Sequence, residues 1–158
     1  MKGATEQIDA LGSFACTRED YRLRAILADS SVECVDTILA LLELHNVVDL
    51  IGRAANFEET IELVVNHQPD LLLVDLDIPF VNLIIPAIIL CRCAAVKVVG
   101  LSQGVFPSHA NDPLMAVDAL IHKQDLYQDL LPVIRALYGD RSGKADGITY
   151  VTRTIRRP

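Results

Sequence analysis

Short apolar runs alternate along the chain with longer stretches in which apolar residues recur at helical spacing. The apolar runs predict five strands, at residues 22–28, 47–53, 70–74, 96–101 and 119–121. The longer stretches predict five helices, at residues 31–44, around 57–65, and at 83–93, 108–115 and 125–137. Strands that alternate with helices through short loops pair in parallel with right-handed crossovers, so the pattern predicts an α/β protein.

The length of the chain selects among the parallel α/β arrangements. At 158 residues we expect one domain, with a doubly wound, flavodoxin-like sheet of five strands in the order 2-1-3-4-5. The strand at 70–74 is apolar throughout, which is typical of a strand covered on both faces. Pro86 falls in the predicted third helix and is compatible with a helix only in its first turn.

Two of the predicted helices carry signals for their buried faces. In the first, Ile38, Leu41 and Leu42 are expected to point inward. The second is expected to begin at Asn56, because Glu59 follows it three residues later. The apolar residues of this second helix recur at positions i, i+4, i+7 and i+8, which is one face of an amphipathic helix. They are Phe57, Ile61, Val64 and Val65.

Composition narrows the class of protein. A hydrophobic content of 51% excludes wholesale disorder, and a formal charge of -7 argues against a general nucleic-acid binder. No window holds the roughly 18 uninterrupted apolar residues that a membrane span needs. The N-terminal sequence MKGATEQIDA has no hydrophobic signal core. We therefore expect a cytoplasmic protein that contacts neither nucleic acid nor membrane directly.

The four cysteines are too few for a disulfide scaffold. Cys34 and Cys91 fall in apolar helical stretches, where a reduced thiol in the core is the favoured interpretation. Cys91 and Cys93 form a C-x-C pair, but a metal site would need a second Cys or His pair at ligand spacing.

The pattern divides the chain into three parts. Residues 1–20 are a mixed, polar lead-in, residues 21–139 form the predicted domain, and residues 140–158 follow it. This last segment has five Lys or Arg and two Asp, a local charge of +3, which leaves -10 on the rest of the chain. We expect a solvated tail or the start of a linker, with a partner-binding arm as the alternative.

Four polar residues follow the predicted strands at the edge where their carboxyl ends meet. In the order 2-1-3-4-5 a ligand is expected at the carboxyl ends of strands one and three, where Asp29 and Asp75 stand. Ser102 ends the fourth strand and Lys123 the fifth. Carboxylate oxygens are ligands for Mg²⁺, and an ammonium and a hydroxyl can hold an anion, so this set suits a phosphoryl group.

Each of these residues also has an ordinary structural interpretation. A strand-end Asp is often a turn former or helix cap, and a strand-end Lys is often a solvated charge. Asp77 is expected to face solvent and Pro79 to serve the loop. The prediction of a site depends on four complementary residues ending four different strands at one edge.

The same residues carry a family resemblance, over about residues 22–137. The chain resembles the receiver domain of two-component response regulators, especially receivers of regulators with helix-turn-helix outputs. The segments that carry the resemblance are RAILADSS, QPDLLLVDLDIP, VVGLS and DALIHK. The usual second acid after strand one is Ser30 here, the usual Gly eight residues after the acceptor is Leu83, and the commonly aromatic switch position is Leu120.

The resemblance implies a role for each site residue. Asp75 would accept a phosphoryl group from a histidine kinase or phosphotransfer protein, as in a phosphorelay. Asp29, Asp75 and the backbone carbonyl of Asp77 would bind Mg²⁺, with Ser30 as a weak, atypical ligand. Lys123 and Ser102 would hold the acyl phosphate. Such a domain is a signalling phosphoprotein and not an ordinary enzyme, since it catalyses at most its own phosphorylation and dephosphorylation.

Two other functions remain open. Ser30 and Leu83 favour a degenerate receiver that binds partner proteins without phosphorylation. A flavodoxin-like enzyme or nucleotide binder is disfavoured, because the turn after strand one reads ADSS and has no Gly-rich phosphate loop. A homodimer through the apolar stretch LIIPAIIL is also possible, although burial of that stretch in the core is the alternative.

Overall fold

The structure, a computed structural model, describes residues 22–90, 95–104 and 117–139. Within them the chain forms one parallel sheet in the order β2-β1-β3-β4-β5, which confirms the predicted doubly wound, flavodoxin-like fold. The strands are β1 (Leu23–Ala28), β2 (Val48–Ala54), β3 (Leu71–Asp75), β4 (Lys97–Ser102) and β5 (Ala119–His122).

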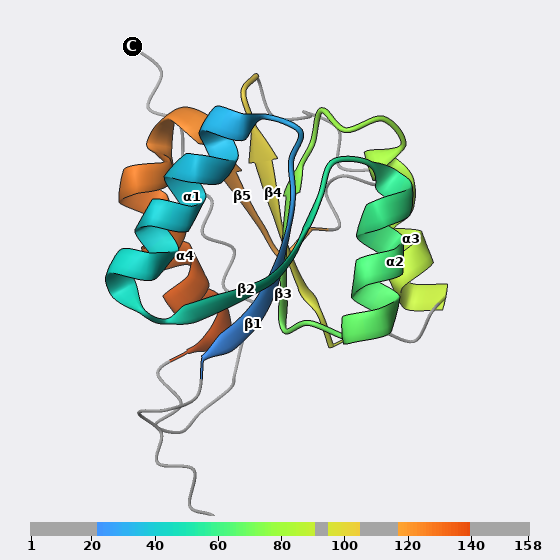
Figure 1. Cartoon of the computed structure of the whole chain (residues 1–158), viewed down its shortest axis with the longest axis horizontal. Coiled ribbons are helices and arrows are strands. Elements are labelled where there is room, and N and C mark those ends of the chain that lie inside the picture. The colour runs from blue at the N-terminus through green and yellow to red at the C-terminus, as the bar shows by residue number, and fades with distance from the viewer. Residues whose placement is uncertain (1–21, 91–94, 105–116, 140–158) are drawn as a thin grey trace, which may run out of the picture.

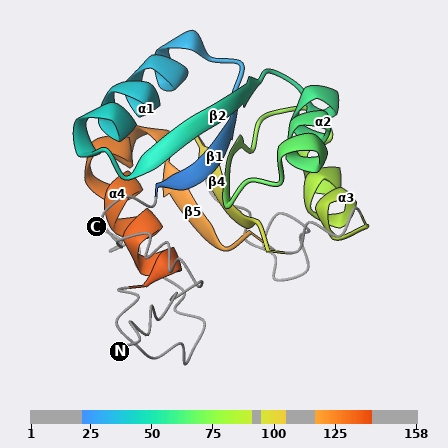
Figure 2. The same ribbon diagram turned by 60° about the horizontal axis from the view of Figure 1, so that its bottom comes forward.

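Helices cover both faces of this sheet, α1 and α4 on one and α2 and α3 on the other (Figures 1 and 2). The helices are α1 (Val32–His45), α2 (Phe57–His67), α3 (Ile84–Leu90) and α4 (Leu126–Tyr138), with short 3-10 turns at Val81–Leu83 and Lys123–Asp125. The predicted helix at 108–115, the lead-in at 1–20 and the tail at 140–158 lie outside the described residues. No helix in the described part is long and apolar enough to cross a membrane.

The central strand β3 is buried at every position, as its unbroken apolar sequence predicts. Leu71 and Leu73 pack on the side of α1 and α4, whereas Leu72 and Val74 pack on the side of α2 and α3. Each such side chain stabilises the fold by about 2 kcal/mol relative to exposure. Because both faces of β3 are covered by apolar side chains, the polar side chain of Asp75 finds polar partners only at the carboxyl edge of the sheet, where β3 ends.

The first two helices begin at polar caps. Ser31 caps α1, and its hydroxyl accepts a hydrogen bond from the backbone N–H of Cys34 at 3.4 Å. Asn56 caps α2 as predicted, since its Oδ1 accepts the N–H of Glu59 at 2.9 Å. These caps fix where each helix leaves the carboxyl edge of the sheet.

The prediction for the apolar face of α2 is wrong at one residue, Val65, which was expected on the buried side. Val65 is 39% exposed, whereas Thr60 is fully buried. Thr60 can be buried because its hydroxyl donates a hydrogen bond to the backbone carbonyl of Asn56 at 2.6 Å. A polar residue that satisfies itself within its own helix is not recognised by a hydrophobic pattern.

The third helix begins one residue later than the pattern predicts. Residues Val81–Leu83 form a 3-10 turn, and α3 starts at Ile84. Pro86 is the third residue of α3, in the first turn, where its missing N–H would have no helical partner. The predicted C-terminal end of this helix, at Cys91 and Cys93, lies outside the described residues.

Candidate functional site

Two aspartates meet at the carboxyl edge of the sheet. Asp75 is the last residue of β3, and Asp29 follows β1 directly. The strands pair with Ala28 opposite Val74, so Asp29 and Asp75 stand level with each other. Each is only 5% exposed. The sheet topology therefore brings together two carboxylates that lie 46 residues apart in the sequence.

Lys123 links the two carboxylates. Its Nζ lies 2.8 Å from Asp29 Oδ2 and 3.0 Å from Asp75 Oδ2. The side chain of Lys123 is 9% exposed, so the ion pairs are largely shielded from water. Lys123 begins the 3-10 turn that follows β5 and is not itself in the strand, which ends at His122.

The other oxygen of each carboxylate accepts a backbone hydrogen bond. Asp29 Oδ1 accepts the N–H of Ser31 at 2.7 Å, and Asp75 Oδ1 accepts the N–H of Asp77 at 3.0 Å. Both are bonds to the residue two positions on, which is the geometry of an Asx turn. Each Asp thus shapes the loop that leaves its strand and directs its second oxygen toward Lys123.

The electrostatic balance of this group is negative. Two carboxylates and one ammonium carry a formal charge of -1. Burial alone would lower the pKa of Lys123, but hydrogen bonds and charge interactions with Asp29 and Asp75 outweigh burial and hold it above its usual 10.5. Lys123 is therefore a permanent cation at neutral pH, and one negative charge remains uncompensated.

Ser102 lies at the same edge but does not contact the charged group. It is 6% exposed, and its hydroxyl bonds to its own loop, accepting the N–H of Gly104 at 3.2 Å and facing the carbonyl of Gly104 at 3.4 Å. Leu101, the residue before it, pairs with Asp75 across β3 and β4. Ser102 therefore lies one residue past the level of Asp75 along the sheet, and its hydroxyl is bonded within its own loop.

The residues of this crevice fit a magnesium ion in part. Asp29 Oδ2 is buried, and the partner that the structure gives it is the Lys123 ammonium at 2.8 Å. Hard oxygen ligands beside an uncompensated negative charge suit Mg²⁺, which commonly keeps several waters. Within the described ranges, however, no cluster of three His, Cys, Asp or Glu could hold a metal. Water and backbone oxygen would have to complete the coordination.

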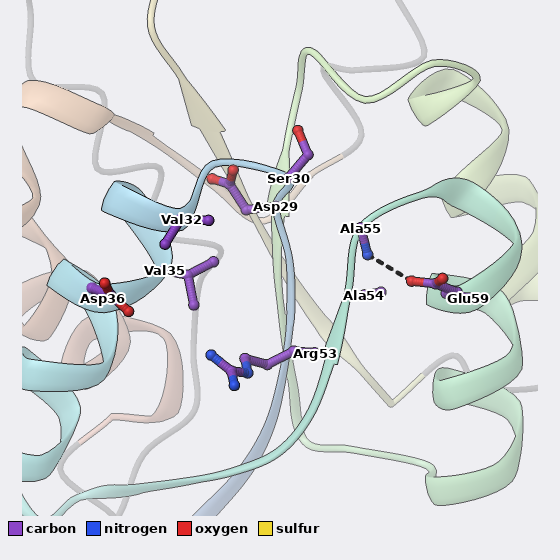
Figure 3. Close-up of a pocket in the computed structure, with 9 residues that line it drawn as sticks. All are labelled: Asp29, Ser30, Val32, Val35, Asp36, Arg53, Ala54, Ala55 and Glu59. Atoms are coloured by element: carbon purple, nitrogen blue, oxygen red, sulfur yellow. Dashed lines mark hydrogen bonds between the residues drawn. The ribbon is translucent and has the colours of Figure 1, made fainter.

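The two remaining predicted ligands follow the buried carboxylates in the sequence. Ser30 and Asp77 are both exposed, whereas Asp29 and Asp75 are buried. An exposed Asp77 side chain agrees with the prediction that only the backbone carbonyl of Asp77 serves as a ligand. In Figure 3 the side chains of Ser30 and Asp29 diverge, as expected of neighbouring residues at the end of a strand. The structure therefore does not bring the Ser30 hydroxyl into the carboxylate pair.

A pocket of about 250 Å³ opens beside Asp29, between the start of α1 and the ends of β1 and β2 (Figure 3). Arg53 lines it and forms no ion pair among the described residues. Sequence reasoning missed Arg53, although β2 ends at the same edge as β1 and β3. The pocket is lined by Asp29, Ser30, Val32, Val35, Asp36, Arg53, Ala54, Ala55 and Glu59.

Cys34, in the first turn of α1, lies in the core beneath the crevice. It is 8% exposed and not part of a disulfide, which confirms the prediction of a reduced, buried thiol. Burial, and then a hydrogen bond to Asp29, raise the pKa of the Cys34 thiol to about 12. A thiol that stays protonated is a poor nucleophile and a poor metal ligand.

Comparison with known proteins identifies the class of fold. No family model matches the chain, and no curated protein matches it. Solved structures do match. One is the signal receiver domain of the putative response regulator NarL from Mycobacterium tuberculosis. Its TM-score is 0.65 at 19% identity, over 75% of this chain and 98% of that chain. The response regulator domain of CheB from Thermotoga maritima has a TM-score of 0.63 and 16% identity, over 73% and 96%.

A third match is the isolated receiver domain of RcsB from Salmonella enterica serovar Typhimurium, determined with the phosphomimetic BeF3⁻. Its TM-score is 0.66 at 19% identity, over 79% of this chain and 93% of that chain. At these identities the likeness establishes the fold. The chain has the fold of response regulator receiver domains, as the sequence resemblance predicts.

Proposed function

We propose that this protein is a receiver that accepts a phosphoryl group on Asp75 from a histidine kinase or phosphotransfer protein. The observation that carries the proposal is the bridge from Lys123 to both Asp29 and Asp75. A buried ammonium between two carboxylates at the switch point of the sheet suits transfer of a dianionic group. The receiver fold of the chain supports the same assignment.

The transfer itself needs one nucleophile and charge neutralisation. An oxygen of Asp75 forms a bond to phosphorus as the bond from phosphorus to the donor's imidazole nitrogen breaks. The electron pair of the broken bond stays on the imidazole, which keeps or takes up a proton. Lys123 loses one ion pair when Asp75 becomes an acyl phosphate, and its ammonium can then bind a phosphoryl oxygen.

Two further groups support the acyl phosphate in this proposal. The Ser102 hydroxyl would exchange its bonds to Gly104 for one to a phosphoryl oxygen. Asp29, Asp75 and the Asp77 carbonyl would hold Mg²⁺, with Ser30 at most a weak ligand. Bound Mg²⁺ would neutralise charge on the transferring phosphoryl group.

The direct test is incubation of the purified full chain with acetyl phosphate and Mg²⁺, followed by intact-mass spectrometry. We expect the mass of one added phosphoryl group in the wild type and none in Asp75→Asn. The matched control is Asp77→Asn, which leaves the backbone carbonyl of residue 77 in place and should still be phosphorylated. Equal phosphorylation of wild type and Asp75→Asn would exclude Asp75 as the acceptor.

A degenerate receiver that acts only by binding proteins is the second candidate. It is favoured by Ser30, which replaces a second acid with an exposed hydroxyl and leaves two carboxylates at the crevice. This candidate predicts no acyl phosphate and no rise in melting temperature at millimolar Mg²⁺. The phosphoryl-accepting candidate predicts that an acyl phosphate forms and that Mg²⁺ raises the melting temperature. The same two measurements therefore separate the candidates.

A further inference from the structure

Gly100 stands at a point in β4 where a side chain has no room. A Cβ atom at this position would lie 2.8 Å from Cδ2 of Leu120 and 3.0 Å from Cδ2 of Leu76. Both distances are shorter than the roughly 3.5–4.0 Å that is optimal between carbon atoms. Among the glycines that the structure describes, positive φ occurs only at Gly139, so the backbone conformation does not require glycine at position 100. Glycine is therefore needed here for space, as is often the case inside a strand.

Leu76 connects this spot to the proposed phosphoryl acceptor. It directly follows Asp75, and its N–H donates a hydrogen bond to the carbonyl of Leu101 at 2.8 Å, so β3 and β4 stay bonded one residue past Asp75. The Asx turn closes around Leu76, through the bond from the N–H of Asp77 to Asp75 Oδ1. The seat of the Leu76 side chain therefore affects where this turn lies, and with it the Asp75 oxygen that contacts Lys123.

Leu120 connects the same spot to the ammonium group. It is the partner of Gly100 in the register of β4 and β5. Lys123 follows Leu120 by three residues and comes directly after the end of β5. The Lys123 ammonium and the Asp75 carboxylate, 3.0 Å apart, are thus carried by two segments that meet over Gly100.

The two leucines lie at the margin of the core. Leu76 and Leu120 are each only partly buried, whereas Val98, two residues before Gly100 on the same face of β4, is 5% exposed and belongs to the core on the α2 and α3 side. A side chain at position 100 can therefore displace the leucines outward with limited loss of core packing. What such a displacement changes is the placement of the two segments that carry the ion pair.

We propose that Gly100 is a positioning residue for phosphoryl transfer to Asp75. The space over Gly100 seats Leu76 and Leu120, and their seats hold the Asp75 carboxylate and the Lys123 ammonium at contact distance. The inference rests on the proposed receiver function and deepens it. Transfer reactions are sensitive to such placement, because a misplacement of about 1 Å can slow them about 100-fold.

The first test needs no phosphorylation. The Lys123 side chain is 9% exposed, so we expect its ammonium protons to exchange slowly with water and to give a signal in ¹⁵N NMR of the full chain. Gly100→Ala should broaden or abolish this signal, because displaced segments open the ion pair to water. The double variant Gly100→Ala/Leu120→Ala should recover it, since the new methyl group takes space that the Leu120 side chain has left. The matched control is Gly52→Ala in β2, where a Cβ atom would lie 3.2 Å from Cδ1 of Leu63, and it should leave the signal unchanged.

The second test is the rate constant of phosphorylation by acetyl phosphate and Mg²⁺, followed over time by intact-mass spectrometry. We expect Gly100→Ala to lower the rate constant about tenfold or more and the double variant with Leu120→Ala to recover most of the loss. Gly52→Ala should react like the wild type. Circular dichroism establishes that each variant is folded at the assay temperature. A merely structural role would lower the melting temperature and leave the rate constant of the folded protein unchanged.

Three results would overturn the proposal: a Gly100→Ala variant with the signal and rate constant of the wild type, a loss that Leu120→Ala does not reverse, or an equal loss in Gly52→Ala. If Gly100→Ala does not fold, Leu76→Ala replaces it, because this change empties the same seat without a clash. An unchanged signal and rate constant in Leu76→Ala would then overturn the proposal. A wild type that acetyl phosphate does not modify would overturn the proposed receiver function, whereas the ammonium signal reports separately whether Gly100 holds the ion pair.

Discussion

Lys123 is the residue on which the crevice depends. It is the cation that the structure places against both buried carboxylates, and both ion pairs are shielded from water. A buried charge without a partner is far more costly than an exposed one. The sequence predicts that Lys123 reaches this edge, because it follows the fifth strand. It does not predict that one ammonium lies between two acids.

Loss of this ammonium should destabilise the fold. Lys123→Met leaves Asp29 and Asp75 buried without a cation, and we expect the free energy of unfolding to fall by about 3 kcal/mol. The control is Lys97→Met, since the Lys97 pair with Asp118 has side chains 44% and 30% exposed and should contribute less than about 1 kcal/mol. Urea denaturation at neutral pH with EDTA measures both. Similar losses in the two variants would contradict the assigned role of Lys123.

Cys34 predicts a loss of stability at alkaline pH. Burial, and then Asp29, raise the pKa of its thiol from 9.0 to about 12 in the folded protein. Above pH 9 the unfolded chain therefore loses a proton that the folded chain keeps, and the free energy of unfolding falls as pH rises toward 12. Lys123 has the same sign: its stabilisation is present below pH 10.5 and is lost as pH rises through its raised pKa.

The contribution of the thiol can be isolated with Cys34→Ala. This variant is less stable at neutral pH because it leaves a cavity, but it no longer has the thiol that titrates. We expect its free energy of unfolding, measured by urea denaturation at several pH values between 9 and 12, to fall less steeply than that of the wild type. Parallel pH profiles would show that the thiol ionises alike in both states.

At the scale of single elements, polar caps determine where the helices leave the carboxyl edge. The start of α2 is predictable from Asn56 and Glu59, and the structure confirms it. The Glu59 carboxylate also accepts the N–H of Ala55 at 2.8 Å, so a cap and a charged side chain satisfy two backbone donors (Figure 3).

Removal of this cap should weaken α2. Asn56→Ala is expected to lower the free energy of unfolding by about 1 kcal/mol, because the N–H of Glu59 loses its partner. Asn66 is the matched control, an exposed Asn inside the same helix, and Asn66→Ala should be neutral or slightly stabilising. Thermal unfolding followed by circular dichroism compares the two variants. A loss in Asn66→Ala as large as that in Asn56→Ala would rule out a capping role.

The element least well predicted is the loop from Asp75 to α3. The resemblance draws attention to Leu83, where receivers usually carry Gly, but positive φ in this loop occurs at Phe80 instead. The predicted start of the third helix, residue 83, is one residue before the start of α3 at Ile84, because hydrophobic spacing does not distinguish the end of a 3-10 turn from the start of an α-helix. The sequence alone therefore does not reveal that Phe80 is exposed and has a left-handed backbone conformation.

At the scale of the whole molecule, the topology of the sheet determines where most of the site residues lie. Alternating strand and helix patterns predict the sheet order, and the sheet order brings Asp29 and Asp75 to one edge. What the sequence cannot predict are side-chain directions. Ser102 lies at the predicted edge, yet its hydroxyl is bonded to Gly104, and Ser30 is exposed beside a buried neighbour. Such directions depend on loop geometry, which no periodicity encodes.

The central claim is that Asp75 is the residue that carries a phosphoryl group. The most direct measurement is chemical mapping of the acyl phosphate: the full chain is treated with acetyl phosphate and Mg²⁺, reduced with borohydride and digested, and the peptides are sequenced by mass spectrometry. An acyl phosphate is reduced to homoserine, and the account predicts homoserine at position 75 alone. Homoserine at position 29 or 77, or at no position while a known receiver treated in parallel is modified, would contradict it.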